Sequence, residues 1–429
     1  MIFDLSAKEQ VWGDKAFEKV VFPHDREQTP KNMTAMPKKL AIWFELNIVI
    51  KLLKVTGIDL ASCDYNHSRL NKLFPKLCTV AGIFAFILSF SFIASEVLFC
   101  GVTRFVSSSV VICMGSTLCM SLLLWIVMLK RRKQFALLID RSGTIHDSFR
   151  VSTNLKPRRW IRLCGYYIFF APLVASLCSV FSIQNDDSYY YLHCYMFGNM
   201  ITTSNNYYKD FLLLFFLTIE NYMQFFLPNL VTVLIFFLCQ YLSDIINTFV
   251  ARCSAENWQE YCLVHGETKT YKILEVYKKI KKNFDVLNEL SSWPIFLIIS
   301  QKFLTLFFTL TVILSSKKKK ILIQLIEACF LAFNAVASLV LLIVAGSRIQ
   351  ETHGKIRSLL FGMIEFREHQ HVPLRYEILP LLKTFVEKED MIMTAAGMIP
   401  VTRSLFLKIG AALVTYGVLI VQLDTSDDP

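Results

Sequence analysis

The chain has 429 residues, of which 54% are hydrophobic and 18% are charged, and it contains 36 Phe residues. Soluble domains carry about 25% charged residues, so this composition, with a mean hydropathy of +0.46, indicates an integral membrane protein rather than a soluble one. The formal net charge of +11 is typical of basic loops beside membrane helices, and no basic stripe with interleaved aromatic residues points to a nucleic-acid partner.

The N-terminal region, residues 1–76, lacks the basic start and apolar core of a signal peptide, so we expect it to remain in the cytosol. Within it, the stretch 41–60 is apolar but is interrupted by Glu45, Lys51 and Lys54. This pattern favours an amphipathic helix at the membrane surface over a spanning helix. Packing against cytosolic helices is an alternative that the residues leave open.

Seven later stretches have the length and apolarity of helices that cross a bilayer, which takes about 20 residues. The predicted spans are residues 77–99, 105–129, 160–183, 211–240, 294–314, 321–346 and 404–423. They divide into helices 1–4 within 77–240, helices 5 and 6 within 294–346, and helix 7 with a short tail within 404–429. The predicted fold class is therefore an all-α membrane protein with seven transmembrane helices.

The distribution of Lys and Arg predicts the orientation, because short cytosolic loops retain the positive excess. Residues 130–159 hold nine Lys and Arg, whereas residues 184–210 hold one. This places the N-terminus inside and the C-terminus outside, with 241–293 and 347–403 also cytosolic. Four consecutive lysines, Lys317 to Lys320, fall on the inferred outer side, but the three basic inner segments outweigh them.

The inner segments have helical patterns of their own. Apolar residues recur at spacings of four and three residues, with lysines on the other face, at Ile273, Tyr277, Ile280, Phe284 and Leu287. A weaker amphipathic helix is predicted over 379–396, with Leu382, Phe385, Met391 and Met393 as its apolar residues. The extension 241–293 and the helices of 347–403 are thus expected to pack as a cytosolic anchor region, unless they lie among the lipid headgroups.

Motifs for catalysis are missing from the sequence. It contains no phosphate-binding glycine loop, no His and Cys cluster with metal-ligand spacing, and no supported Ser, His and Asp arrangement. We therefore expect no enzyme activity, no cofactor and no metal site.

Polar residues inside the predicted spans are candidate functional groups, because each costs several kcal/mol in hydrocarbon unless it is paired or hydrated. Those predicted to line an outward pocket for a small organic ligand, together with aromatic walls, are Phe170, Phe216, Glu220, Asn221, Tyr222, Gln324 and Glu327. Gln301 and Lys302 lie near mid-depth in the fifth span. Neutralisation of the acids by Lys302 or Arg104 is the alternative explanation for these charges.

The last span carries several polar groups, and Thr415, Leu419 and Gln422 recur at four and three residues on one helical stripe. Such groups either line a pore or bond to neighbouring helices, and the residue chemistry alone favours the second reading. Lys408, near the start of this span, fits neither assignment clearly.

The end of the chain resembles the signature of the arthropod gustatory and odorant receptor superfamily, which is Thr-Tyr, five mostly apolar residues, Gln, and then Phe or Leu. Here it reads Thr415-Tyr416, G-V-L-I-V, Gln422-Leu423, and upstream Arg403 and Ser404 stand in the expected places. The inverted seven-helix plan is also similar to that superfamily. Gly417 and Leu423 depart from the commonest gustatory pattern, so the resemblance is to the superfamily more than to one branch of it.

The resemblance implies a gustatory receptor in the plasma membrane that is a ligand-gated, non-selective cation channel. It further implies a homo- or hetero-tetramer, a small extracellular tastant, and the passage of monovalent and divalent cations. Carried over by motif position, Leu419, Gln422 and Leu423 line the pore with Thr415 on the same stripe, while Tyr416 packs against the fifth or sixth helix. The alternatives are a transporter or a metabotropic seven-helix receptor, and the residues do not choose the ligand.

Overall fold

The computed structural model describes residues 39–60, 69–99, 108–148, 159–183, 206–255, 258–314, 322–369 and 390–426. In chain order the elements are α1 (Lys39–Val55), α2 (Arg69–Phe99), α3 (Ser108–Ser148), α4 (Arg159–Ile183), α6 (Asn206–Asn221), the π-helical turn η2 (Tyr222–Phe226), α7 (Leu227–Ala255), α8 (Trp258–Leu314), α9 (Leu322–His369), β1 (Thr394–Ala395), β2 (Ile399–Pro400) and α11 (Arg403–Ser426). The predicted all-α class is confirmed for the described residues.

Five helical stretches are long and apolar enough to cross a membrane. They lie in α2, in α3, in the continuous helix formed by α6, η2 and α7, in α8 and in α9. A shorter apolar stretch, Cys164–Val180, lies in α4. The predicted spans 160–183 and 404–423 coincide with α4 and α11. The chain is therefore a multi-pass membrane protein.

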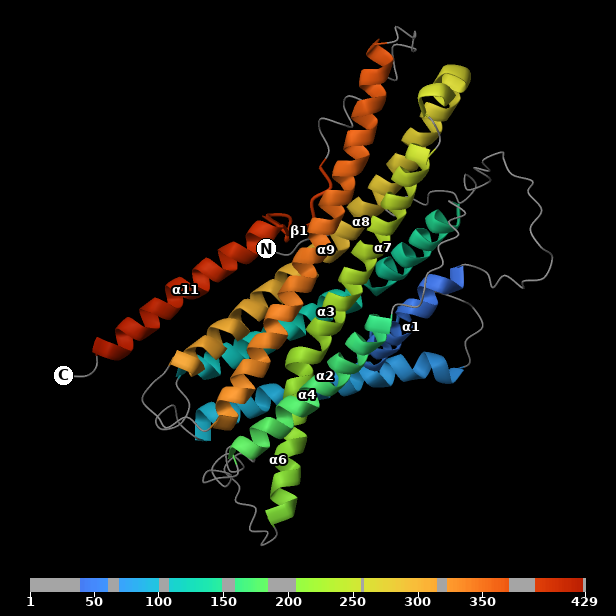
Figure 1. The fold of residues 1–429 in the computed structure, drawn as a ribbon. Coiled ribbons are helices and arrows are strands. Elements are labelled where there is room, and N and C mark those ends of the chain that lie inside the picture. The colour runs from blue at the N-terminus through green and yellow to red at the C-terminus, as the bar shows by residue number, and fades with distance from the viewer. Residues whose placement is uncertain are drawn as a thin grey trace, which may run out of the picture.

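Helices α7, α8 and α9 form the centre of the bundle, and they continue past the ends of their neighbours in Figure 1. The most apolar stretch within Phe211–Ala251, the helix that includes α7, is 94% buried, so it contacts protein on nearly every side. Helix α8 has 57 residues, which at about 1.5 Å per residue is far longer than a bilayer core. The predicted fifth span and the predicted amphipathic helix are thus two parts of one helix.

The apolar seam predicted over residues 273–287 of α8 is confirmed. The five side chains at the spacings of four and three are all buried, and Tyr277, Ile280, Phe284 and Leu287 are at most 2% exposed. They belong to one core cluster that also contains Ile356 and Leu360 of α9 and Phe135 of α3. A helical period of 3.6 residues puts these positions on one face, which is why the spacing alone located the seam.

Helix α1 is an integral part of the bundle. Leu46, Val49 and Leu53 are fully buried, and α1 packs against α2, α3, α4 and α7. The indole Nε1 of Trp125 in α3 donates a 2.9 Å hydrogen bond to the carbonyl oxygen of Thr56, just beyond the end of α1. We predicted that this segment would lie at the membrane surface, and its burial does not fit that position. Helix α1 instead packs against other helices.

The predicted helix over 379–396 is wrong at its C-terminal end, and its earlier part, 379–389, lies outside the described residues. Residues 390–393 are non-helical, and β1 and β2 then form a short hairpin that pairs Thr394 with Pro400. Its turn holds Ala396 and Gly397 at φ values of 51° and 71°. A left-handed pair cannot continue a right-handed helix, so the turn overrides the apolar periodicity. Met391 and Met393 are still buried.

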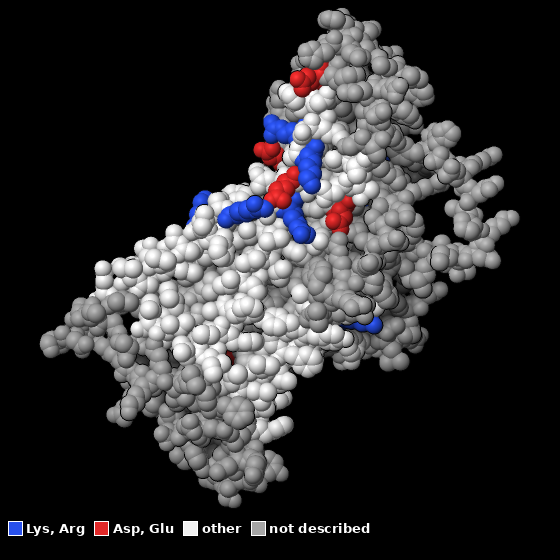
Figure 2. Space-filling view, viewed as in Figure 1, with Lys and Arg blue, Asp and Glu red and all other residues white. Residues whose placement is uncertain are grey.

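The described surface separates into an apolar and a charged part. In Figure 2 the Lys, Arg, Asp and Glu side chains gather around the start of α11 and the adjoining part of α9, and the described surface below them is almost uncharged. Helix α2 exposes Phe74, Val80, Phe84 and Ile87, each by at least 46%. Such exposure suits hydrocarbon, since lipid tails are the solvent for these side chains.

Candidate functional site

A cavity lies inside the bundle where α3, α4, α6, η2, α8 and α9 meet. Its volume is about 100 Å³, and it is lined by Cys113, Met114, Thr117, Ser179, Leu217, Glu220, Asn221, Gln224, Phe225, Thr305, Phe308 and Leu331. Six elements each contribute at least one side chain, so the cavity exists only in the packed bundle. A mostly apolar wall with a few convergent polar groups is the usual composition of a small-molecule site.

The π-helical turn shapes the polar side of the cavity. Pro228 follows it and has no N–H to donate to the carbonyl oxygen of Gln224 four residues earlier. Two side chains from other helices donate to that oxygen instead: Ser121 of α3 at 3.1 Å, and Gln301 of α8. Gln301 also donates to Ser121 over 2.9 Å. The proline thus explains why polar groups of α3 and α8 converge on η2.

Glu220 is the acidic group of the cavity. Its side chain is 4% exposed, and its Oε1 accepts a 3.1 Å hydrogen bond from Nε2 of Gln224, one turn along the helix. Asn221, the next residue, donates a 3.0 Å hydrogen bond from Nδ2 to Oγ of Ser176 in α4. Both residues are therefore held in place by polar neighbours while they line the cavity.

A second polar network surrounds Lys302, which is fully buried. Its Nζ donates a 2.8 Å hydrogen bond to Oδ1 of Asn229 in α7 and lies 5.6 Å from the ring centroid of Phe225. Ser338 of α9 donates to the same Oδ1 over 2.9 Å, and Nδ2 of Asn229 donates to Oδ1 of Asn334 over 2.9 Å. We considered neutralisation of Lys302 by an acid. The structure instead surrounds its ammonium with amide and hydroxyl groups.

The structure brings together only part of the predicted pocket. Glu220 and Asn221 line the cavity. Phe170 is 50% exposed, Phe216 packs edge-on against Phe92 at 4.6 Å, and Tyr222 donates a 2.7 Å hydrogen bond to the carbonyl oxygen of Phe169. Gln324 and Glu327 belong to α9, but their side chains lie outside the described residues.

Sequence reasoning missed most of the lining residues. Thr117, Ser179 and Thr305 are single hydroxyls in apolar helices, a pattern that equally fits packing. A usable signal came from Pro228, because a proline inside an apolar run leaves the carbonyl oxygen four residues earlier, here that of Gln224, without its helical donor.

Helix α11 lies along one side of the bundle, against α8 and α9 (Figure 1). The ring of Tyr416 stands edge-on to Phe307 of α8 at 5.6 Å, which confirms its predicted packing against the fifth segment. Thr415, Leu419 and Gln422 are all exposed, and the hydroxyl of Thr415 donates to the Ala411 carbonyl oxygen over 2.9 Å. The side chain of Leu423 lies outside the described residues.

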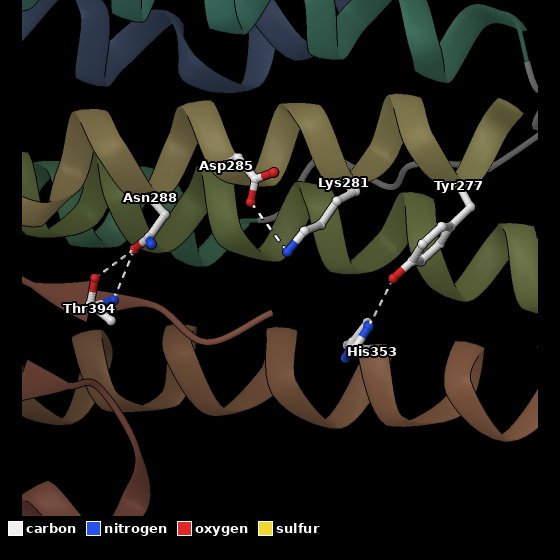
Figure 3. Close-up of polar contacts among 6 residues, drawn as sticks. All are labelled: Tyr277, Lys281, Asp285, Asn288, His353 and Thr394. Atoms are coloured by element: carbon white, nitrogen blue, oxygen red, sulfur yellow. Dashed lines mark hydrogen bonds and ion pairs between the residues drawn. The ribbon is translucent and has the colours of Figure 1, made fainter. Parts of the chain in front are cut away.

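The start of α11 is fixed to the long helices by the hairpin. In Figure 3 Asn288 of α8 points to Thr394 in β1, whose backbone N–H donates to Asn288 Oδ1 over 2.9 Å. The Gly397 N–H donates to Oγ of Ser292 over 2.8 Å. Arg403 forms an exposed ion pair with Glu351 of α9.

Helices α8 and α9 are also joined to each other beside the hairpin. The hydroxyl of Tyr277 and Nε2 of His353 face each other at 3.2 Å, while Lys281 and Asp285 pair along α8 at 3.4 Å (Figure 3). Helices α8 and α9 are thus joined to each other, and each also contacts the segment that leads into α11.

A bundle of long apolar helices that encloses a small cavity defines a multi-pass membrane protein. The chain matches the model of the 7tm chemosensory receptor family over residues 46–427, and it belongs to that family. No curated protein sequence is significantly similar to it. The earlier resemblance to the insect gustatory and odorant receptor superfamily is thereby confirmed.

Solved structures agree with this fold. The olfactory receptor OR5 of the insect Machilis hrabei in complex with eugenol has a TM-score of 0.65 at 11% identity, covering 90% of this chain and 100% of that one. The same receptor described without eugenol has a TM-score of 0.61 at 11% identity, with the same coverage. At this identity the likeness concerns the fold.

Proposed function

We propose that the protein is a taste receptor that works as a ligand-gated, non-selective cation channel in the plasma membrane. In this proposal seven helical segments span the bilayer: α2, α3, α4, the continuous helix of α6, η2 and α7, then α8, α9 and α11. The N-terminus is cytosolic and the C-terminus is extracellular. The extensions of α8 and α9 form the cytosolic anchor, and four copies surround a pore with their α11 helices.

The observation that carries the proposal is the exposed stripe of α11. Thr415, Leu419 and Gln422 are exposed, whereas Gly417 is buried and lies close to Leu310 of α8. A membrane helix whose exposed side carries Thr415 and Gln422 suits a water-filled surface better than hydrocarbon. A pore between four copies would supply such a surface. Gln422 would then offer a neutral oxygen to cations, and Leu419 and Leu423 an apolar constriction.

We assign ligand binding to the cavity between α3, α6 and α8. It lies in the half of the bundle away from the long extension of α8, and this is the outer half in the proposed orientation. The eugenol complex of the compared olfactory receptor supports a small organic molecule as the ligand class. Ligand binding would shift the packing of α8 and α9, to which α11 is fastened, and so change the population of the open pore.

The test is recording from cells that express the full chain. Leu419→Ala and Gln422→Ala should each change ion permeability or basal current while surface expression stays the same. Val414→Ala serves as a control, because Val414 is exposed on α11 away from the stripe. Unchanged conduction in both stripe variants would argue against the pore assignment. Ion fluxes at the slow rate of transporter turnover, without single-channel currents, would favour a transporter.

A further inference from the structure

Lys408 lies on the exposed stripe of α11 that also carries Thr415, Leu419 and Gln422. It stands seven, eleven and fourteen residues before them, and at 3.6 residues per turn these positions lie within about 40° of Lys408 around the helix. All four side chains are exposed. The lysine that the sequence patterns left without a role is therefore on the same side of α11 as the residues assigned to the pore.

The neighbouring exposed part of α11 is apolar. Leu407, Val414 and Val418 are exposed by 73%, 68% and 52%, and they lie to one side of the stripe. Ser404, one turn before Lys408, is also exposed and extends the stripe toward the start of the helix. A lysine that only reached lipid headgroups could stand anywhere around the helix near its end. The position of Lys408 among the polar residues instead suits a side of α11 that faces water.

The other cation among the described side chains of α11 is already paired. Arg403, at the start of the helix, forms an exposed ion pair with Glu351 of α9. Within the described part of the chain, the ammonium of Lys408 forms no hydrogen bond or ion pair. Lys408 lies about 21 Å from Gln422 along the helix axis, at about 1.5 Å per residue, which is near the cytosolic end in the proposed orientation. The stripe thus carries a positive charge toward its inner end.

We propose that the Lys408 side chains of four copies form a positive ring at the cytosolic mouth of the pore, which hinders the exit of cations and discriminates against divalent cations. This inference rests on the proposed function, because it takes the α11 stripe as the pore wall. Acidic rings are typical of cation channels, whereas Lys and Arg rings favour anions. A lysine ring therefore lowers the cation concentration at the inner mouth, and inward current should exceed outward current at equal and opposite voltages.

The expected size of this effect follows from Coulomb's law with salt screening. For a lumen wall about 8 Å from the pore axis, which equals the Debye length at physiological salt, four unit charges in water lower the concentration of a monovalent cation on the axis about threefold. The same potential acts twice on a divalent cation, so its concentration falls about tenfold. The ring thus disfavours Ca²⁺ relative to Na⁺ by about threefold.

The experiment records basal current from inside-out patches of cells that express the full chain, with Na⁺ and then Ca²⁺ as the permeant cation. Lys408→Gln keeps a long polar side chain but removes the charge, and it should raise the ratio of outward to inward current about threefold. It should also raise the permeability of Ca²⁺ relative to Na⁺ about threefold. Lys408→Arg should behave as the native chain, and Lys408→Glu should exceed Lys408→Gln in both measurements.

A transfer of the charge to the neighbouring position tests the direction of the side chain. The double variant Lys408→Gln with Leu407→Lys keeps the net charge and the depth of the lysine, but it turns the charge about 100° around the helix and off the stripe. It should conduct like Lys408→Gln alone.

Cysteine labelling adds a readout that needs no current. In permeabilised cells a charged, water-soluble maleimide should react faster with Lys408→Cys than with Leu407→Cys, although Leu407 is 73% exposed and lies at the same depth. The unsubstituted chain gives the background from native cysteines.

Cation currents whose rectification and Ca²⁺ permeability are the same in the native chain and in Lys408→Gln would overturn the ring while upholding the channel. Restoration of the native values by Leu407→Lys would reveal a general surface-charge effect and would also overturn the ring, as would equal labelling of the two cysteine variants. Absence of cation current from the native chain and from every variant would overturn the proposed channel function and the ring together.

Discussion

The guanidinium of Arg131 in α3 donates a 3.0 Å hydrogen bond to the carbonyl oxygen of Leu290 in α8. Leu290 lies four residues before Pro294, which has no N–H for that oxygen. The same side chain also donates to the Glu289 carbonyl oxygen at 2.6 Å. A proline inside α8 is thus accommodated by a side chain from another helix.

Two side chains of α3 donate hydrogen bonds to carbonyl oxygens that a proline leaves without a helical donor. Ser121 bonds to the carbonyl oxygen of Gln224 that Pro228 leaves without a helical donor, and Arg131 does so for Leu290. The first contact adjoins the cavity, and the second lies close to where the hairpin docks on Ser292. Helix α3 therefore links the two regions that the proposed gating must connect.

We predict that Arg131→Met lowers the melting temperature of the purified protein, because it removes both hydrogen bonds from Nη1 of Arg131 to carbonyl oxygens of α8. The loss should be about 1–2 kcal/mol, the usual cost of an unsatisfied carbonyl. Arg131→Lys should lose less, since it keeps a donor. Lys133→Met is the control, because Lys133 is an exposed side chain on the same helix. Equal melting temperatures for Arg131→Met and Lys133→Met would refute the role of Arg131.

The Lys302 network predicts an asymmetry between its two partners. Asn229→Leu leaves a buried ammonium without its amide oxygen and should cost about 3 kcal/mol or more. Lys302→Met removes the charge and leaves Asn229 bonded to Ser338, so it should cost less. The double variant should therefore be more stable than Asn229→Leu alone. Thermal unfolding in detergent measures this order, and a double variant weaker than both single variants would contradict it.

Gly346 in α9 allows the chain to approach closely just before α11. A Cβ at this position would lie 2.3 Å from the carbonyl oxygen of Val401, whereas one at Gly354 on the same helix would have nothing within 4 Å. Gly346→Ala should destabilise the protein by about 1–3 kcal/mol through overpacking and alter basal current, because it displaces the segment leading into α11. Gly354→Ala should be neutral or slightly stabilising. Similar currents and melting temperatures for the two variants would show that the close approach is unimportant.

The proposed orientation predicts where antibodies can reach. A tag after Pro429 should be stained on intact cells, and a tag before Met1 only after permeabilisation. The four lysines Lys317 to Lys320 make this test informative, because they oppose the charge rule that the other basic segments obey. Staining of the C-terminal tag only in permeabilised cells would reverse the orientation or change the number of spans.

The sequence by itself determined the membrane class, the positions of the long apolar helices and the buried seam that includes Tyr277 and Phe284. These features depend on composition and on a helical period within one segment, so local sequence is enough to find them. The same reasoning was wrong over 390–396, where a left-handed turn at Ala396 and Gly397 ended the periodicity.

Only the tertiary structure decided the cavity and its polar side. Gln301 meets Gln224 across 77 positions of the chain, and Arg131 meets Leu290 across 159. Glu220 could be suspected from its place in an apolar helix, but Thr117 and Thr305 could not, because a hydroxyl in a membrane helix is equally well satisfied by its own backbone. Which hydroxyl oxygen faces a cavity depends on how separate helices rotate and pack, and no local pattern encodes that.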